Sequence, residues 1–359
     1  MAAPDWKRGP PTPRKATDIR RIQFTGGSTY IVSLPKNWVK SHGLQPKDTV
    51  SIQWKDDGEL AIRPTDVLDT TQRKVLEIDV SELPKRSLMD HLVGAYVAGC
   101  ERIVLNSSKK IPRSVRKTLR ELLRNTRGLE VVIEEEDTIV IASMLKPSEI
   151  PLRVSINRMY LQISSLLGDL MAVLGGGDEE LLEDSEDIEG DIDGLRLLID
   201  RQVGLSLEYS TVSHAIGLTR RVANEHAHIA RSLERMGDHV YKICALVRDG
   251  HRPRKLSDSE LPLSSVSPFM QAFRDLIESV RRPDPDLIGR ARVVLEGEVN
   301  SLSDYEEELL TSEGEEGDKL FLYRLAEAFR RSCGYGIDIA ESLINIHCHS
   351  SSYLSTDDE

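Results

Sequence analysis

The chain has 359 residues, which is long for a single hydrophobic core and predicts two or three domains. Its 59 acidic and 47 basic residues give a net charge of −12, which excludes a protein that coats nucleic acid along its whole surface. The charge is uneven, because the segment up to Arg63 contains 11 Lys and Arg against 6 Asp and Glu. We therefore expect a cationic first module on an acidic body.

The cysteines and the apolar runs indicate the compartment. The four cysteines form no Cys-x-x-Cys pair, so neither a zinc ribbon nor a disulfide framework is expected. No apolar run approaches the length of a membrane span, and the polar start lacks the core of a signal peptide. The sequence thus predicts a cytoplasmic protein with no membrane insertion.

The first module, residues 14–66, is predicted to be a small β domain. Glycines at 26 and 27 separate two β-prone runs, and Asp57-Gly58 separates two more, as in hairpins. Pro35 is placed to start a short helix that Gly43 would end. A unit this small cannot bury a good core alone, so we expect it to dimerise.

The order of motifs in this module resembles a known family. Thr25-Gly-Gly-Ser-Thr-Tyr-Ile-Val-Ser-Leu-Pro-Lys-Asn-Trp-Val39, with Gly43-Leu44, Lys47-Asp48 and Asp57-Gly58 after it, is similar to the AbrB/SpoVT swapped-hairpin DNA-binding domain. The resemblance implies an intertwined homodimer that presents basic side chains to DNA phosphates. The alternative for each side chain is a solvated surface position. The DNA contacts that the resemblance implies are Arg14, Lys15, Arg20, Arg21 and Lys36.

Residues 70–147 alternate strand and helix patterns, which predicts a small α/β domain. Strands are expected at 74–80, 102–106, 129–133 and 138–142, and helices at 83–100, with Ser81 as its cap, and at 112–124. No phosphate loop, nucleophile elbow or metal-spaced histidine pair is present, so the role of this domain stays open. Its second helix is strongly basic, and forms either a solvated face or a contact to DNA or another anion; the basic residues are Arg113, Arg116, Lys117, Arg120 and Arg124.

From residue 150 to 349 the strand patterns vanish and helical periodicity takes over. A first apolar stripe ends at Gly175, and helices are expected at 182–207, 211–247, 268–280, 285–310 and 318–346. Prolines between 253 and 268 mark a linker between two groups of three helices. The sequence predicts a tandem pair of three-helix bundles, at about 150–250 and 264–346.

The two bundles correspond residue by residue. Glu189-Gly-Asp-Ile-Asp-Gly-Leu195 aligns with Glu296-Gly-Glu-Val-Asn-Ser-Leu302, and Ile229–Asp238 aligns with Leu325–Gly334. Asp193, Glu234 and Asp238 thus correspond to Asn300, Arg330 and Gly334. The second bundle retains only Glu296 of the four carboxylates.

The first bundle contains two acidic pairs, Glu189 with Asp193 and Glu234 with Asp238. A spacing of four places both carboxylates of a pair on one helix face, and packing would bring the two pairs together. Carboxylates that close repel one another unless a cation lies among them. A solvated acidic face is the alternative. We predict a metal site in the first bundle and not in the second.

Glu189-x-x-x-Asp193 and Leu233-Glu-Arg-Met-Gly-Asp-His239 resemble motifs of the PhoU family of phosphate-uptake regulators, over about residues 150–346. The resemblance implies a divalent or trivalent ion of the iron, zinc or manganese class on the acidic pairs. It also implies control of phosphate import through partner proteins. With the first module, the chain is similar to the archaeal type of PhoU-domain transcription regulator. Arg330 and Gly334 depart from the family's second acidic motif. Arg330 with Arg331 would instead hold a phosphate or pair with Glu296.

These features predict a homodimeric, DNA-binding regulator of phosphate homeostasis. No nucleophile with a nearby base, nucleotide loop or cofactor motif is present, so an enzyme is not expected. An adaptor is the main alternative, docking on a phosphate ABC transporter ATPase or a sensor kinase and using the β module only to dimerise. A di-metal carboxylate enzyme is disfavoured, because the acidic pairs lack the Glu-x-x-His pattern.

Overall fold

The structure is a computed structural model that describes residues 18–54, 58–65, 74–84, 87–146, 148–250 and 256–352. It divides into two compact units, Met1–Arg73 and Lys74–Glu359, and each is described by itself. In the described ranges, no helix is long and apolar enough to cross a membrane.

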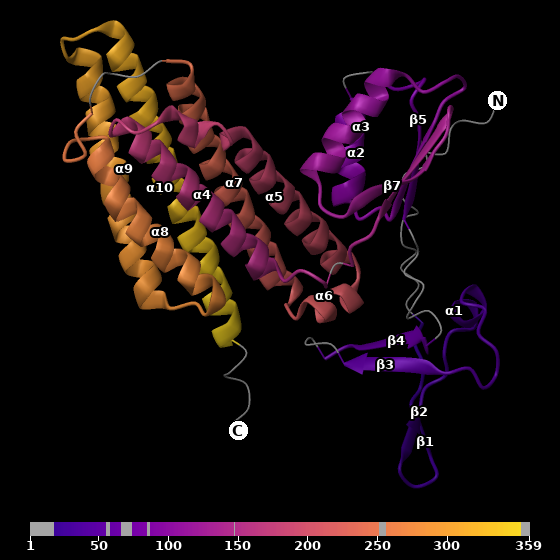
Figure 1. Cartoon of the computed structure of the whole chain (residues 1–359). Coiled ribbons are helices and arrows are strands. Elements are labelled where there is room, and N and C mark those ends of the chain that lie inside the picture. Colours follow the sequence, from indigo (N-terminus) through magenta and orange to yellow (C-terminus); the bar gives the residue numbers. More distant parts are fainter. Residues whose placement is uncertain are drawn as a thin grey trace. The chain divides into compact units, whose positions relative to one another are not determined.

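The first unit consists of two antiparallel hairpins and a short helix (Figure 1). β1 (Gln23–Thr25) and β2 (Thr29–Ile31) are joined by Gly26 and Gly27, whose φ angles of 65° and 81° favour glycine. α1 (Lys36–Ser41) follows Pro35, and β3 (Val50–Trp54) pairs with β4 (Leu60–Pro64). The predicted hairpins and helix are therefore confirmed.

This unit has almost no core of its own. Among its described side chains Pro64 is the only buried one. Large apolar side chains are instead exposed: Phe24 is 60% exposed, Tyr30 73% and Trp54 80%. So much exposed apolar surface in one small unit is unfavourable in water.

The second unit begins with a mixed four-stranded sheet of order β5-β6-β8-β7. The strands are β5 (Val75–Asp79), β6 (Arg102–Asn106), β7 (Leu129–Glu134) and β8 (Thr138–Ser143). β5 runs parallel to β6, and β8 pairs antiparallel with both β6 and β7. The connections from β5 to β6 and from β6 to β7 contain α2 (Leu88–Val97) and α3 (Arg113–Asn125), respectively.

The helix expected at 83–100 is shorter than predicted. Ser81 does not cap it, because its backbone N–H donates to the Asp79 carboxylate in a turn after β5. α2 starts only after Ser87 and ends before Gly99, whose φ of 81° is left-handed. Local turn hydrogen bonds here compete with the helix at both ends.

The rest of the unit is helical, with one continuous apolar core. α4 (Leu152–Leu174), α5 (Ser185–Glu208), α6 (Ser210–Ile216) and α7 (Arg220–Arg248) form the first group, with the 3-10 turn η3 (Glu179–Leu182) before α5. After η4 (Leu263–Ser265), α8 (Val266–Arg281), α9 (Pro285–Thr311) and α10 (Glu316–Ser352) form the second. α7 packs against α10 where the two groups meet.

One predicted helix, 211–247, is divided in two. Gly217 has a φ of 74° and ends α6 in the left-handed conformation. Thr219 then caps α7, because its hydroxyl accepts a hydrogen bond from the Val222 backbone N–H. The prediction of a single helix was wrong at this point because the apolar pattern continues across the break.

α5 belongs to the helical core and to the α/β part at once. Leu197 is buried in the core beneath the sheet. The Arg201 guanidinium donates hydrogen bonds to the carbonyl oxygens of Tyr96 and Cys100, at 2.6 Å and 3.0 Å. At Gly194 an added Cβ would lie 2.9 Å from the Asn125 carbonyl oxygen. Close packing and buried hydrogen bonds therefore attach the α/β part to this helix.

We expect Gly194→Ala to destabilise the protein by about 1–3 kcal/mol, because the new methyl group meets backbone that cannot move freely. Gly297→Ala in α9, at the position that aligns with Gly190, is the control, since nothing lies within 4 Å there and alanine favours a helix by roughly 0.5–1 kcal/mol. Urea unfolding of the two variants measures both. Equal effects would contradict the close contact at Gly194.

Candidate metal centre

The two acidic helices approach each other closely at one glycine. Ile192 on α5 and Met236 on α7 are buried in the shared core. Between these helices, Gly237 leaves space for Ile192, because a Cβ there would lie 3.0 Å from the Ile192 Cδ1 atom. Asp193 directly follows Ile192 and Asp238 directly follows Gly237. The same close packing therefore brings the acidic faces of the two helices together.

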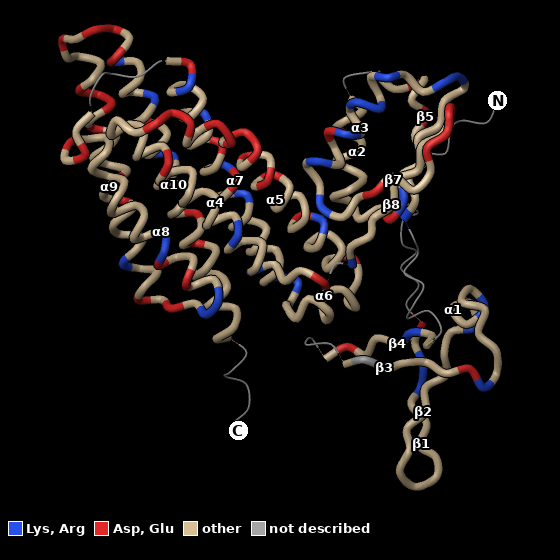
Figure 2. Tube along the Cα trace, in the orientation of Figure 1, with Lys and Arg blue, Asp and Glu red and all other residues tan. Residues whose placement is uncertain are grey.

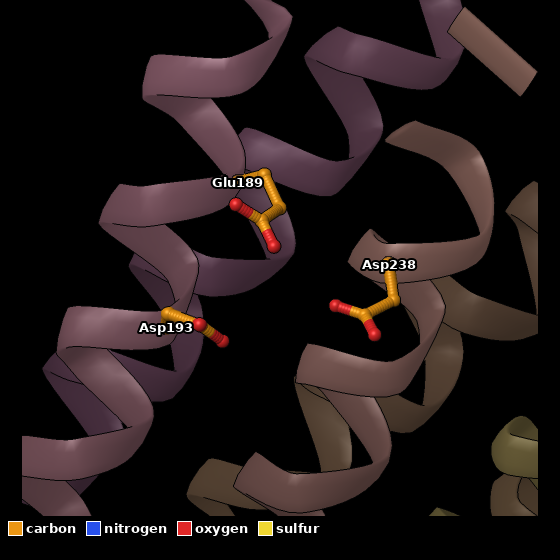
Figure 3. A group of neighbouring side chains, drawn as sticks. All are labelled: Glu189, Asp193 and Asp238. Carbon is orange, nitrogen blue, oxygen red and sulfur yellow. The ribbon is translucent and has the colours of Figure 1, made fainter. Parts of the chain in front are cut away.

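Three carboxylates meet between the helices. Glu189 and Asp193 of α5 and Asp238 of α7 each place one carboxylate oxygen within 4.8 Å of the others, and Figure 3 shows the three side chains across the space between the two helices. A hard cation forms bonds of about 2.0–2.6 Å to oxygen, so ligand atoms on one ion lie at most about 5 Å apart. The spacing therefore suits a single cation.

The fourth predicted ligand, Glu234, lies beside Asp193 but is not one of the three closely spaced carboxylates. Its carboxylate lies 3.6 Å from the Arg196 guanidinium, which also bonds to Asp200 at 2.7 Å. The structure thus groups three of the four predicted carboxylates and places Glu234 beside a counter-charge. Sequence reasoning missed Arg196, although its position three residues after Asp193 is on the same helix side.

Three carboxyls at this place, those of Glu189, Asp193 and Glu234, have raised pKa values. Burial, and then the charges of Asp193 and Asp238, raise the pKa of Glu189 to about 7. Burial also raises the pKa of Asp193 and of Glu234, and the Arg196 guanidinium opposes the rise in both. Glu189 therefore keeps its proton to a higher pH than an ordinary glutamate, and a cation beside it would oppose this.

One atom of the site bears on whether these residues fit a metal. The Asp193 Oδ1 atom is buried and has no hydrogen-bond partner within the described ranges. A buried carboxylate oxygen without a partner is costly, and a cation would satisfy it. With carboxylate oxygens as the whole donor set, the residues fit a hard or borderline ion such as Mn²⁺, Fe²⁺ or Zn²⁺.

The corresponding surface of the second helical group is neutralised by arginines. The Arg330 guanidinium lies 2.7 Å from the carboxylate of Glu306, which is only 7% exposed. Glu296 pairs with Arg292, one turn earlier on its own helix, at 2.8 Å. The alternative that Arg330 pairs with Glu296 was therefore wrong. Arg331 pairs with Glu327 at 3.0 Å.

The raised pKa of Glu189 predicts a pH dependence of the metal-free protein. Between about pH 4.5 and 7 the folded state keeps a proton that the unfolded state has lost. Stability present below pH 4.5 is therefore lost as pH rises through 7. Allowing for solvent screening, we expect a loss of roughly 1–2 kcal/mol between pH 5 and 8 in chelator, absent in Glu189→Gln. Urea titrations measure it, and identical pH slopes for the two proteins would contradict the shift.

The residues predicted to contact DNA are only partly described. Arg14 and Lys15 lie outside the described residues. Arg20 and Arg21 precede β1 and Lys36 begins α1, and all three are exposed. The Arg20 guanidinium lies 3.3 Å from the Asp18 carboxylate, an exposed pair that solvent screens.

Two family models match the chain. Residues 23–67 match the antidote-toxin recognition domain of MazE, a bacterial antitoxin, and residues 156–247 match the PhoU domain. The chain therefore contains a MazE/AbrB-type domain followed by a PhoU domain, as the motifs predicted. The PhoU match covers α4 to α7 and so includes the acidic trio. Searches among curated proteins and among solved structures gave no match.

This pair of domains defines the class of the protein. Both families are regulatory and non-catalytic. Their combination supports a regulator of phosphate homeostasis in general.

Proposed function

We propose that the protein is a dimeric DNA-binding transcription regulator of phosphate homeostasis, whose PhoU domain holds a metal ion on Glu189, Asp193 and Asp238. The first unit is the DNA-binding part, and the helical part responds to the ion. Phosphate-transport proteins, such as a transporter ATPase or a sensor kinase, are further candidate partners.

The single observation that carries the DNA-binding proposal is the first unit itself. It matches a MazE/AbrB-type model, its apolar side chains are exposed as a dimer interface requires, and the sequence up to Arg63 is strongly basic. A dimer formed through the apolar surface would present two copies of Arg20, Arg21 and Lys36. Such doubled cationic surfaces bind DNA by neutralising phosphates.

The metal part rests on the trio, on the Asp193 oxygen that lacks a partner in the described chain, and on the raised pKa of Glu189. A bound ion would supply positive charge that cross-links α5 and α7. Glu189 and Asp193 would hold the ion from α5 and Asp238 would hold it from α7, while Glu234 pairs with Arg196 at 3.6 Å.

DNA binding is tested by replacing Arg20 and Arg21 with Ala in the intact protein. A dimer would lose four phosphate contacts, so its affinity for DNA should fall. The slope of log Kd against log salt concentration should decrease by roughly 3–4. Fluorescence anisotropy on DNA fragments selected from the genome measures both quantities.

The control variant is Lys109→Ala with Lys110→Ala, which removes the same charge from the exposed turn before α3. Its affinity for DNA should be unchanged. If wild type and both variants bind DNA equally weakly at low salt, the adaptor function replaces the regulator, and the first unit serves only to dimerise.

A further inference from the structure

A charged groove runs between α3 of the α/β part and the start of α5. It is open, with a volume of about 750 Å³. Lys117, Arg120 and Arg124 line one wall, and Glu186 and Glu189 belong to the other. Figure 2 shows blue segments along α3 and red segments at the start of α5.

The basic wall is accessible, and only Arg120 in it has a hydrogen bond within the described ranges, from its Nε to the Arg116 carbonyl oxygen at 3.2 Å. Lys117, Arg120 and Arg124 are exposed, and none of them forms an ion pair with a carboxylate within the described ranges. By contrast, Arg116 on the same helix pairs with Glu134, and Arg127 pairs with Asp191. Spacings of three and four place these three cations, which have no carboxylate partner in the described ranges, along one side of α3 over about 10 Å.

The acidic wall leads to the candidate metal centre. Glu189 lines the groove and is also one of the three clustered carboxylates. A cation on the trio would therefore adjoin the groove through Glu189. Three carboxylate oxygens leave a hard cation with coordination positions for further oxygen atoms. Manganese- and magnesium-type ions commonly fill such positions with phosphate oxygens.

We propose that this groove binds a polyphosphate anion, either the phosphate chain of a nucleotide or an inorganic polyphosphate, between the metal centre and the basic wall of α3. Guanidinium groups match phosphate oxygens in a bidentate manner, and Lys117 adds a point charge. The row of three cations is longer than a single phosphate, which favours a chain of phosphoryl groups. The proposal rests on the proposed metal site.

The two charged walls make anion binding depend on the metal. Without a cation, Asp184, Glu186 and Asp187 repel an anion that approaches the basic wall. With a cation on the trio the anion gains an attractive partner at the end of the groove. Metal and polyphosphate should therefore raise each other's affinity by the same factor.

Isothermal titration calorimetry of the full chain tests this proposal, with ATP, inorganic triphosphate, inorganic phosphate and sulfate as probes, each with and without Mn²⁺. We expect triphosphate-bearing probes to bind only with Mn²⁺. Arg120→Gln with Arg124→Gln should weaken them at least about tenfold, because two charge-assisted contacts are lost. Lys109→Gln with Lys110→Gln removes equal charge outside the groove and should leave binding intact.

These titrations distinguish a nucleotide from an inorganic polyphosphate as the ligand. They also distinguish the groove from the proposed metal site. Equal binding of ATP and triphosphate identifies the phosphate chain alone as the ligand, whereas tighter ATP binding adds the nucleoside. Binding that is unaffected by the Arg120 and Arg124 changes, or lost in Arg20→Ala with Arg21→Ala, would overturn the groove as the site. So would inorganic phosphate binding as tightly as triphosphate. A Mn²⁺-dependent thermal shift without any anion binding would refute this inference and leave the proposed metal site standing.

Discussion

Mn²⁺, Fe²⁺ or Zn²⁺ should raise the thermal midpoint of the wild-type protein, and should leave that of Asp193→Asn with Asp238→Asn unchanged. At one hundred times its dissociation constant, an ion bound only to the folded state adds about 2.7 kcal/mol. For a unit as large as Lys74–Glu359 this corresponds to a rise of roughly 4–5 °C. Differential scanning calorimetry with each ion, and with chelator as reference, measures the shift.

The two helical groups supply the matched control for this measurement. Glu296→Gln removes the carboxylate of α9 that aligns with Glu189 and that Arg292 already neutralises. Its metal-induced shift should equal that of the wild type. Loss of the shift in Glu296→Gln, or no shift in the wild type with any of the three ions, would identify the acidic pairs as a solvated face.

Sedimentation should show that the intact chain is a dimer and that Ile52→Asp converts it to a monomer. Ile52 lies on β3 and is 57% exposed in the single chain, among the large apolar side chains that a second copy would cover. A carboxylate buried without a partner at that surface costs several kcal/mol in each protomer. Analytical ultracentrifugation at micromolar concentration measures the change.

Lys40→Ala is the control for the dimer, because Lys40 is an exposed charged residue of the same unit. It should leave the sedimentation coefficient unchanged. A wild-type monomer over the whole concentration range, or an Ile52→Asp protein that remains dimeric, would show that this surface is not the dimer interface.

Local patterns in the sequence predicted much of the fold. Gly26-Gly27 and Asp57-Gly58 predicted two hairpins, and the apolar spacing located α4, α5 and α7 to α10. The break at Gly217 escaped because periodicity records which residues face the core and not the backbone conformation between them. Contacts between distant segments were not predictable, since neither Arg201 nor Leu197 differs in pattern from an ordinary residue of an amphipathic helix.

The candidate metal centre was predictable for a related reason. A spacing of four within a helix is a local property, so the pairing of Glu189 with Asp193 could be derived directly. The side-chain direction of Glu234 could not, because it depends on Arg196 of a different helix. The groove between α3 and α5 was beyond reach too, because it exists only where two parts of the chain pack together.

The contact at Gly194 shows that the two halves of the duplicated helical part have diverged unequally. Gly194 faces the Asn125 carbonyl oxygen, whereas the aligned residue of α9, Ser301, is exposed. The α/β part therefore requires a residue without a side chain at this position of α5, whereas α9 carries a serine at the aligned position. An exchange of helix segments should therefore be asymmetric: the α5 sequence would be tolerated in α9, but the α9 sequence in α5 would release the α/β part.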